Sequence, residues 1–148
     1  MHRGLRLFRS LVAAFLLTLA TIPSPLPAHA ASLGHFGVDE GYQAPDLFRQ
    51  SGASWDRIDF HWDSMQPSGP TDWLPAANVT DADISNDLAL GMTVVGVITN
   101  PPAWATRNGS VPSTLSLSWS DPLNSWAAYV HRLVAQYAGR IDTWIIWN

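Results

Sequence analysis

The chain has 148 residues, 47% of them hydrophobic, and a formal net charge of −4 at pH 7. This length fits one modest domain. The absence of cysteine and lysine excludes disulfides, a lysine Schiff base and a phosphate-binding loop ending in Gly-Lys-Ser/Thr.

Residues 1–30 have the pattern of a cleavable secretory signal. Three arginines precede the apolar run Leu11–Ile22, which is shorter than the roughly 20 residues that span a bilayer. We expect cleavage near Ala30 and secretion to the extracellular space or the periplasm. Losing three arginines moves the net charge from −4 to −7 in residues 31–148. This acidity argues against nucleic-acid partners, and no membrane association is expected after cleavage.

The first half of the mature chain alternates between strand and helix signals. Residues 33–39 form a short apolar run with glycines, which predicts a strand. Residues 43–52 combine an early proline, apolar residues and a final glycine, which predicts a short helix. Residues 54–60 alternate in polarity and predict a second strand. Residues 61–78, rich in Pro, Gly, Ser and Asp, are expected to form a long loop.

A second helix is predicted to begin after Thr80, a helix N-cap with aspartates in the following turn, and to close at Gly91. Residues 92–99 are a continuous β-branched run, typical of a parallel strand covered on both faces. Residues 100–120 form another long loop. Long loops within a compact domain are usually functional.

A third helix is expected with Asp121 as N-cap, Pro122 in its first position and Gly139 at its end. Residues 141–148 then predict a fourth strand. Alternating strands and helices predict parallel strands with right-handed crossovers. The expected fold is therefore α/β, the N-terminal half of a TIM (β/α)8 barrel ending at strand 4, since a complete barrel needs about 250 residues.

The residue types present limit which kinds of catalytic site the chain could form. The histidines at positions 35, 61 and 131 have no metal-ligand spacing, so neither a metal nor a cofactor is expected. Carboxylates remain, and glycoside hydrolysis uses two of them. Pairs drawn from Asp39, Glu40, Asp59 and Asp63 are possible, although each also reads as a solvated loop charge. Arg57 lies inside a strand, and a partly buried arginine needs an anionic partner, for structure alone or to hold a catalytic carboxylate ionised.

Three stretches, in chain order, resemble one enzyme group. "GASWDRIDFHWDSMQPSGPTDW" looks like the second strand and loop of clan A glycoside hydrolases, the retaining (β/α)8 enzymes that include families 5 and 39. Its matching residues are Gly52, Arg57, Trp62, Gln66, Pro67, Gly69 and Trp73. "GMTVVGVITNPPAWA" is similar to their third strand, through Pro102, Trp104 and Ala105. "YAGRIDTWIIWN" resembles their fourth strand, usually continued as Trp-Asn-Glu-Pro.

The resemblance implies that residues 31–148 are part of a hydrolase domain that cleaves β-linked O-glycosidic bonds in a carbohydrate substrate. The acid/base glutamate would follow Asn148 and the nucleophile would come later, so the chain as given is expected to be inactive. Asn148 would bind the sugar 2-hydroxyl and Arg57 would support the nucleophile. The remaining candidates would line the cleft: Trp62, Asn100, Trp104 and Trp147. Asp59 and His61 lie nearby without a firm match.

Another class of function stays open. All eight tryptophans lie after residue 30, and a secreted acidic domain rich in tryptophan also suits a non-catalytic carbohydrate-binding or interaction domain. About half of these tryptophans are expected in the core. A half barrel would also expose the edges of its first and fourth strands, so we expect the isolated chain to aggregate or dimerise.

Overall fold

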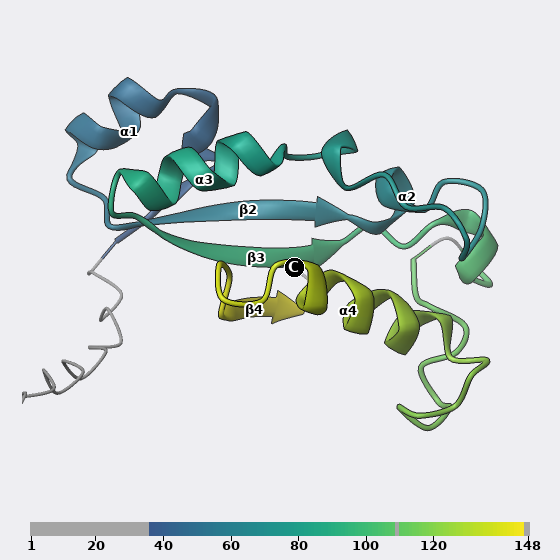
Figure 1. Ribbon diagram of the computed structural model, residues 1–148. Coiled ribbons are helices and arrows are strands. Elements are labelled where there is room, and N and C mark those ends of the chain that lie inside the picture. The colour runs from purple at the N-terminus through teal and green to yellow at the C-terminus, as the bar shows by residue number, and fades with distance from the viewer. Residues whose placement is uncertain (1–35, 109, 147–148) are drawn as a thin grey trace, which may run out of the picture. The chain divides into compact units, whose positions relative to one another are not determined.

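The computed structural model describes residues 36–108 and 110–146 of the chain. These residues contain a four-stranded sheet in the order β1-β2-β3-β4, with every neighbouring pair parallel (Figure 1). The strands are β1 (Val38–Asp39), β2 (Trp55–His61), β3 (Thr93–Thr99) and β4 (Thr143–Ile146). The predicted α/β class with parallel strands in chain order is confirmed.

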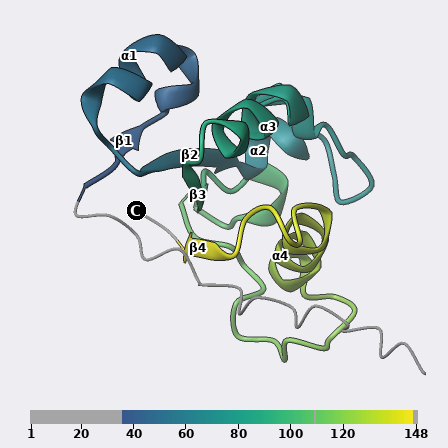
Figure 2. The same ribbon diagram turned by 60° about the vertical axis from the view of Figure 1, so that its left-hand side comes forward.

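Helical segments connect the strands. The α-helices are α1 (Pro45–Ser51), α2 (Trp62–Met65), α3 (Asp81–Ala89) and α4 (Ser125–Gln136). Three short 3₁₀ helices are η1 (Gly41–Gln43), η2 (Pro75–Ala77) and η3 (Ala103–Ala105). Helices α3 and α4 lie on the same side of the sheet (Figure 2). The main hydrophobic core forms between them and the strands, around Phe60, Ile98, Leu133 and Tyr137.

The two faces of β2 differ because successive side chains of a strand point to opposite sides. Asp56, Ile58 and Phe60 are buried on the helix-covered face. The alternate residues are half-buried on the other face: Trp55, Arg57, Asp59 and His61. This alternation directs Ile58 and Phe60, together with the buried Asp56, toward the helices, and places a row of polar and charged side chains on the other face.

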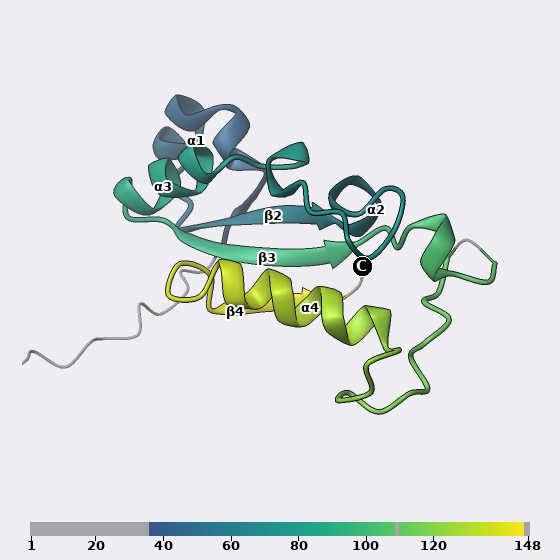
Figure 3. The same cartoon turned by 45° about the vertical axis from the view of Figure 1, so that its right-hand side comes forward.

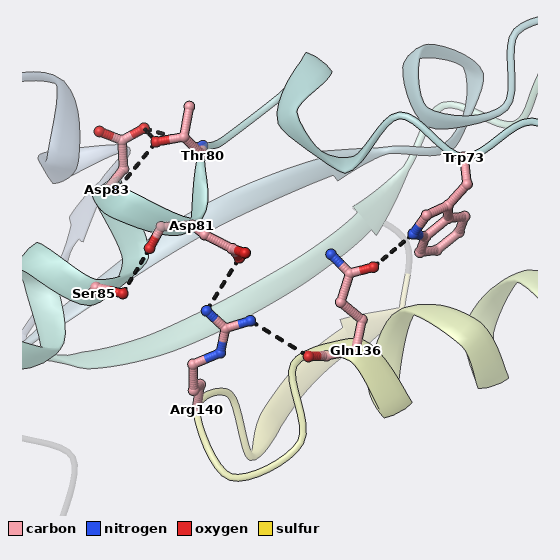
Figure 4. A network of polar contacts seen from close by, with 7 residues as sticks. All are labelled: Trp73, Thr80, Asp81, Asp83, Ser85, Gln136 and Arg140. Atoms are coloured by element: carbon pink, nitrogen blue, oxygen red, sulfur yellow. Dashed lines mark hydrogen bonds and ion pairs between the residues drawn. The ribbon is translucent and has the colours of Figure 1, made fainter.

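The start of α3 follows the predicted capping pattern. Thr80 Oγ1 accepts a hydrogen bond from the Asp83 amide at 3.2 Å, and the Asp83 carboxylate accepts one from the Thr80 amide at 3.1 Å (Figure 4). This reciprocal pair satisfies two amides that have no partner within the helix. Thr80 is therefore the N-cap that the sequence predicts.

Arg140 ties α3 to the end of α4. Its Nη1 donates to Asp81 Oδ1 at 3.1 Å, and its Nη2 donates to the Gln136 carbonyl at 3.4 Å. The Gln136 side chain in turn accepts from Trp73 Nε1 at 2.6 Å (Figure 4). This chain of contacts joins both helices to the loop after β2, and so supports the position of that loop.

The predicted start of the last helix is wrong. Asn124, not Asp121, is its N-cap: Asn124 Oδ1 accepts from the Ala127 amide at 3.0 Å, and its Nδ2 donates to the carbonyls of the preceding loop. Asp121 instead accepts from the Leu123 amide in a turn. Leu123, which the helical spacing includes, is 76% exposed. The loop before α4 offers Asn124 more hydrogen bonds, which moves the helix start to Ser125.

Other observed helix boundaries also differ from the predicted ones. The 61–78 stretch, predicted as a loop, contains α2 and η2, and the 100–120 stretch contains η3. The helix predicted over 43–52 corresponds to α1, which ends at Ser51 with Gly52 as a left-handed C-cap, and η1 precedes it. Among the described residues, none of the helices is long and apolar enough to cross a membrane. The predicted signal sequence, residues 1–30, lies outside the described residues.

Candidate functional site

The loops that follow β2 and β3 leave the same end of the sheet (Figure 3). Parallel strands bring their carboxyl ends together, and in (β/α)8 barrels this end carries the active site. Here the end of β1 and one face of β2 bring together Asp39, Glu40, Arg57, Asp59 and His61. These five residues are called the strand-end cluster below.

Arg57 is the central cation of the strand-end cluster. Its side chain is only 19% exposed, and its Nη1 donates to Asp39 Oδ1 at 2.7 Å. Its Nη2 lies 3.6 Å from Asp59 Oδ1, and His61 Nε2 lies 3.8 Å from Asp59 Oδ2. The expectation of a partly buried arginine with an anionic partner is confirmed. Asp59 is thus flanked by a permanent cation and by an imidazole on its own strand.

Glu40 completes the cluster from the end of β1. Its backbone is left-handed, with φ 52° and ψ 42°, and its amide donates to the Arg57 carbonyl at 2.8 Å. Burial raises the pKa of the Glu40 carboxyl, the charges of Asp59 and Asp39 raise it further, and His61 opposes them. Non-glycine residues seldom adopt this conformation, and such outliers are frequent at functional sites.

The carboxylates proposed from sequence therefore separate into two groups. Asp39, Glu40 and Asp59 interact within the strand-end cluster. Asp63 lies in the first turn of α2, is exposed, and its amide donates to the Asn100 carbonyl at 2.8 Å. A carboxyl group with a raised pKa, as in Glu40, is the kind of group that general acid catalysis uses.

Trp62 and Trp104 have mainly packing contacts. Trp62 is 0% exposed, stacks on Tyr129 at 4.9 Å between ring centroids, and donates from Nε1 to Gln66 Oε1 at 2.6 Å. Trp104, half-buried, meets the Trp62 ring edge-on and donates to the Gln66 carbonyl at 2.7 Å. Trp62 therefore has no face open to a ligand, and only Trp104 keeps part of its surface exposed.

Asn100 lies just after β3 with a left-handed backbone, φ 51°, and is exposed beside the cluster end of the sheet. Thr99, which pairs in register with His61, has a buried hydroxyl with no hydrogen-bond partner among the described residues. Trp147 and Asn148 lie outside the described residues.

Sequence reasoning left Asp59, His61 and Glu40 without a firm role. The period-2 alternation of β2 already places Arg57, Asp59 and His61 on one face, and this signal could have grouped them. Glu40 joins them only through the conformation of the turn after β1. Among residues 36–108 and 110–146, no group of three or more His, Asp and Glu side chains is arranged to hold a metal ion.

Parallel strands in chain order that alternate with helices have the arrangement of half a TIM (β/α)8 barrel. The chain is similar to the solved structure of a family 39 glycoside hydrolase from the gut symbiont Bacteroides cellulosilyticus WH2. The two share 19% identity with a TM-score of 0.53, over 75% of this chain and 24% of the other. The match therefore shows the fold, and this chain spans about a quarter of that structure. No protein-family model and no curated protein sequence matches.

Proposed function

We propose that this chain is the N-terminal part of the catalytic barrel of a secreted retaining glycoside hydrolase. The complete enzyme would cleave β-linked O-glycosidic bonds through a glycosyl-enzyme intermediate. The observation that carries the proposal is the strand-end cluster, built around Arg57, on a half barrel similar to that of a family 39 glycoside hydrolase.

Arg57 has the role of a fixed cation in this mechanism. A retaining enzyme needs one carboxyl that is protonated and one that is ionised, and a neighbouring cation lowers the pKa of the carboxylate that it contacts. Arg57 is partly buried and already held by Asp39 at 2.7 Å, so its position is fixed before substrate binds. Asp59 and His61 extend the polar row toward the strand end, where sugar hydroxyls would bind.

The first experiment reads the genomic sequence beyond the codon of Asn148. The proposal expects the frame to continue with Glu and Pro, followed by the remaining strands and helices of a barrel. A stop codon there would favour the alternative of a non-catalytic sugar-binding domain. Trp119, 51% exposed on the loop before α4, supports this alternative because its ring could stack on a sugar.

The second experiment measures turnover of aryl β-glycosides. The 148-residue chain is expected to be inactive, whereas the protein encoded by the continued frame is expected to be active. In that longer protein, Arg57→Lys should lower kcat by at least tenfold, because the single ammonium group of lysine cannot replace the rigid guanidinium that lies between Asp39 and Asp59. Arg49→Lys is the matched control, since Arg49 forms an exposed pair with Asp46 on α1. Activity of the 148-residue chain that Glu40→Gln abolishes would refute the proposal.

A further inference from the structure

Two aspartates lie fully buried on the helix-covered face of the sheet, outside the strand-end cluster. Asp56 in β2 and Asp87 in α3 are both 0% exposed. Asp56 accepts hydrogen bonds from the amides of Gly41, at 2.7 Å, and Tyr42, at 2.9 Å. Among the described residues, neither carboxyl oxygen of Asp87 accepts a hydrogen bond. A buried carboxylate without a donor is costly, so Asp87 requires another explanation.

The two carboxyl groups interact with each other. Helix α3 packs against β3 and η1, which brings Asp87 to the side chain of Asp56. The pKa of Asp87 is raised to about 7, mainly by burial. The hydrogen bond to Asp56 and the charges of Asp56 and Asp83 also raise it. Burial also raises the pKa of Asp56, with a further contribution from Asp39, while hydrogen bonds from Asp87, Gly41 and Tyr42 oppose it.

We propose that Asp56 and Asp87 share one proton and form a pH-sensitive clamp joining α3 to β2 and to the η1 turn. In the closed form, the protonated Asp87 donates its O–H to Asp56. The ionised Asp56 holds the amides of Gly41 and Tyr42, directly after Glu40. Loss of the proton to solvent leaves two buried anions side by side, whose repulsion loosens α3 and the turn. This inference does not depend on the proposed function.

The direction of the pH effect follows from the pKa of Asp87. Its folded-state value of about 7 lies above the ordinary 3.8, so the folded state retains a proton that the unfolded chain releases. The stabilisation is therefore complete below pH 3.8 and is lost as the pH rises to about 7. Between pH 5 and 8 this group alone should lower the folded-to-unfolded ratio by about a hundredfold.

The test compares urea unfolding of the 148-residue chain at pH 5 and pH 8 with that of Asp87→Asn. The amide donates the same hydrogen bond to Asp56 without titrating. Between pH 5 and pH 8, the folded-to-unfolded ratio of Asp87→Asn should fall by about a hundredfold less than that of the wild type. At pH 8, Asp87→Asn should be more stable than the wild type. Asp46→Asn, which removes an exposed carboxylate on α1, is the matched control and should retain the wild-type dependence.

Hydrogen exchange locates the effect. After correction for intrinsic rates, the Gly41 and Tyr42 amides should exchange faster at pH 8 than at pH 5 in the wild type, and equally in Asp87→Asn. The clamp is refuted if Asp87→Asn loses stability with pH as the wild type does. Failure of Asp87→Asn to fold at pH 5 would also refute it, because the amide preserves the proposed bond.

Discussion

Replacement of Gly96 by alanine tests how closely β3 is packed against Trp144, near the start of β4. Gly96 pairs in register with Trp144, whose ring covers it. A Cβ added at Gly96 would lie 2.4 Å from Trp144 Cζ3 and 2.5 Å from Cε3. The ring cannot move inward easily, because its centroid is 5.3 Å from that of Phe60 and 6.4 Å from that of Tyr137.

The magnitude follows from two opposing effects. Overpacking a well-filled core typically costs about 1–3 kcal/mol. Alanine is less flexible than glycine in the unfolded chain, which offsets roughly 0.5–1 kcal/mol. Because the contacts are shorter than 3 Å and involve a rigid ring, the upper part of the overpacking range applies, and we expect Gly96→Ala to lower the free energy of unfolding by about 1–2 kcal/mol.

Urea unfolding followed by far-UV circular dichroism provides the assay. Gly69→Ala is the control, because an added Cβ there meets no atom within 4 Å. The double variant Gly96→Ala/Trp144→Leu should lose less stability than the two single variants combined, since the smaller side chain relieves the contact. If Gly96→Ala is as stable as the wild type, the inferred contact between Gly96 and Trp144 is wrong.

Two further predictions concern the helix cap and the core. Thr80→Ala should lower the free energy of unfolding by about 1 kcal/mol through loss of the capping bond, whereas Thr80→Ser should keep it. Urea unfolding measures the difference, and equal stability of the wild type and both variants would contradict the capping role. Trp62→Ala should lower the free energy of unfolding by about 3–5 kcal/mol, because the side chain is fully buried. Trp119→Ala, at an exposed position, should change thermal stability little. A small loss of stability in Trp62→Ala would contradict the core position of Trp62.

Local sequence rules predict the parts of this fold that depend on neighbouring residues. The alternation at residues 54–60 and the β-branched run at 92–99 both predict strands that the structure contains, because strand periodicity is a local property. Thr80 caps α3 as predicted, since its partner Asp83 is three residues away. The same rules fail at Asp121, because Asn124 gains bonds to loop carbonyls that helix patterns do not encode.

The tryptophans show a similar division. The sequence predicts that about half of them lie in the core but does not select which. Trp62 and Trp126 are buried and Trp119 is exposed. Trp62 was a candidate for the cleft on its position in a motif, yet its ring lies against Tyr129, a residue of α4. Whether an aromatic ring faces solvent depends on the helix that covers it, and that helix is distant in sequence.

Local sequence patterns are sufficient to predict the order of strands and helices, the parallel α/β class and the need of Arg57 for an anionic partner. These follow from periodicity, capping and the cost of burying a charge. Three pairings come from the tertiary structure alone: Asp39 of β1 binds Arg57 of β2, Glu40 joins them, and Asp56 lies against Asp87. Such pairings join residues from different strands and helices, so packing of the whole domain selects them.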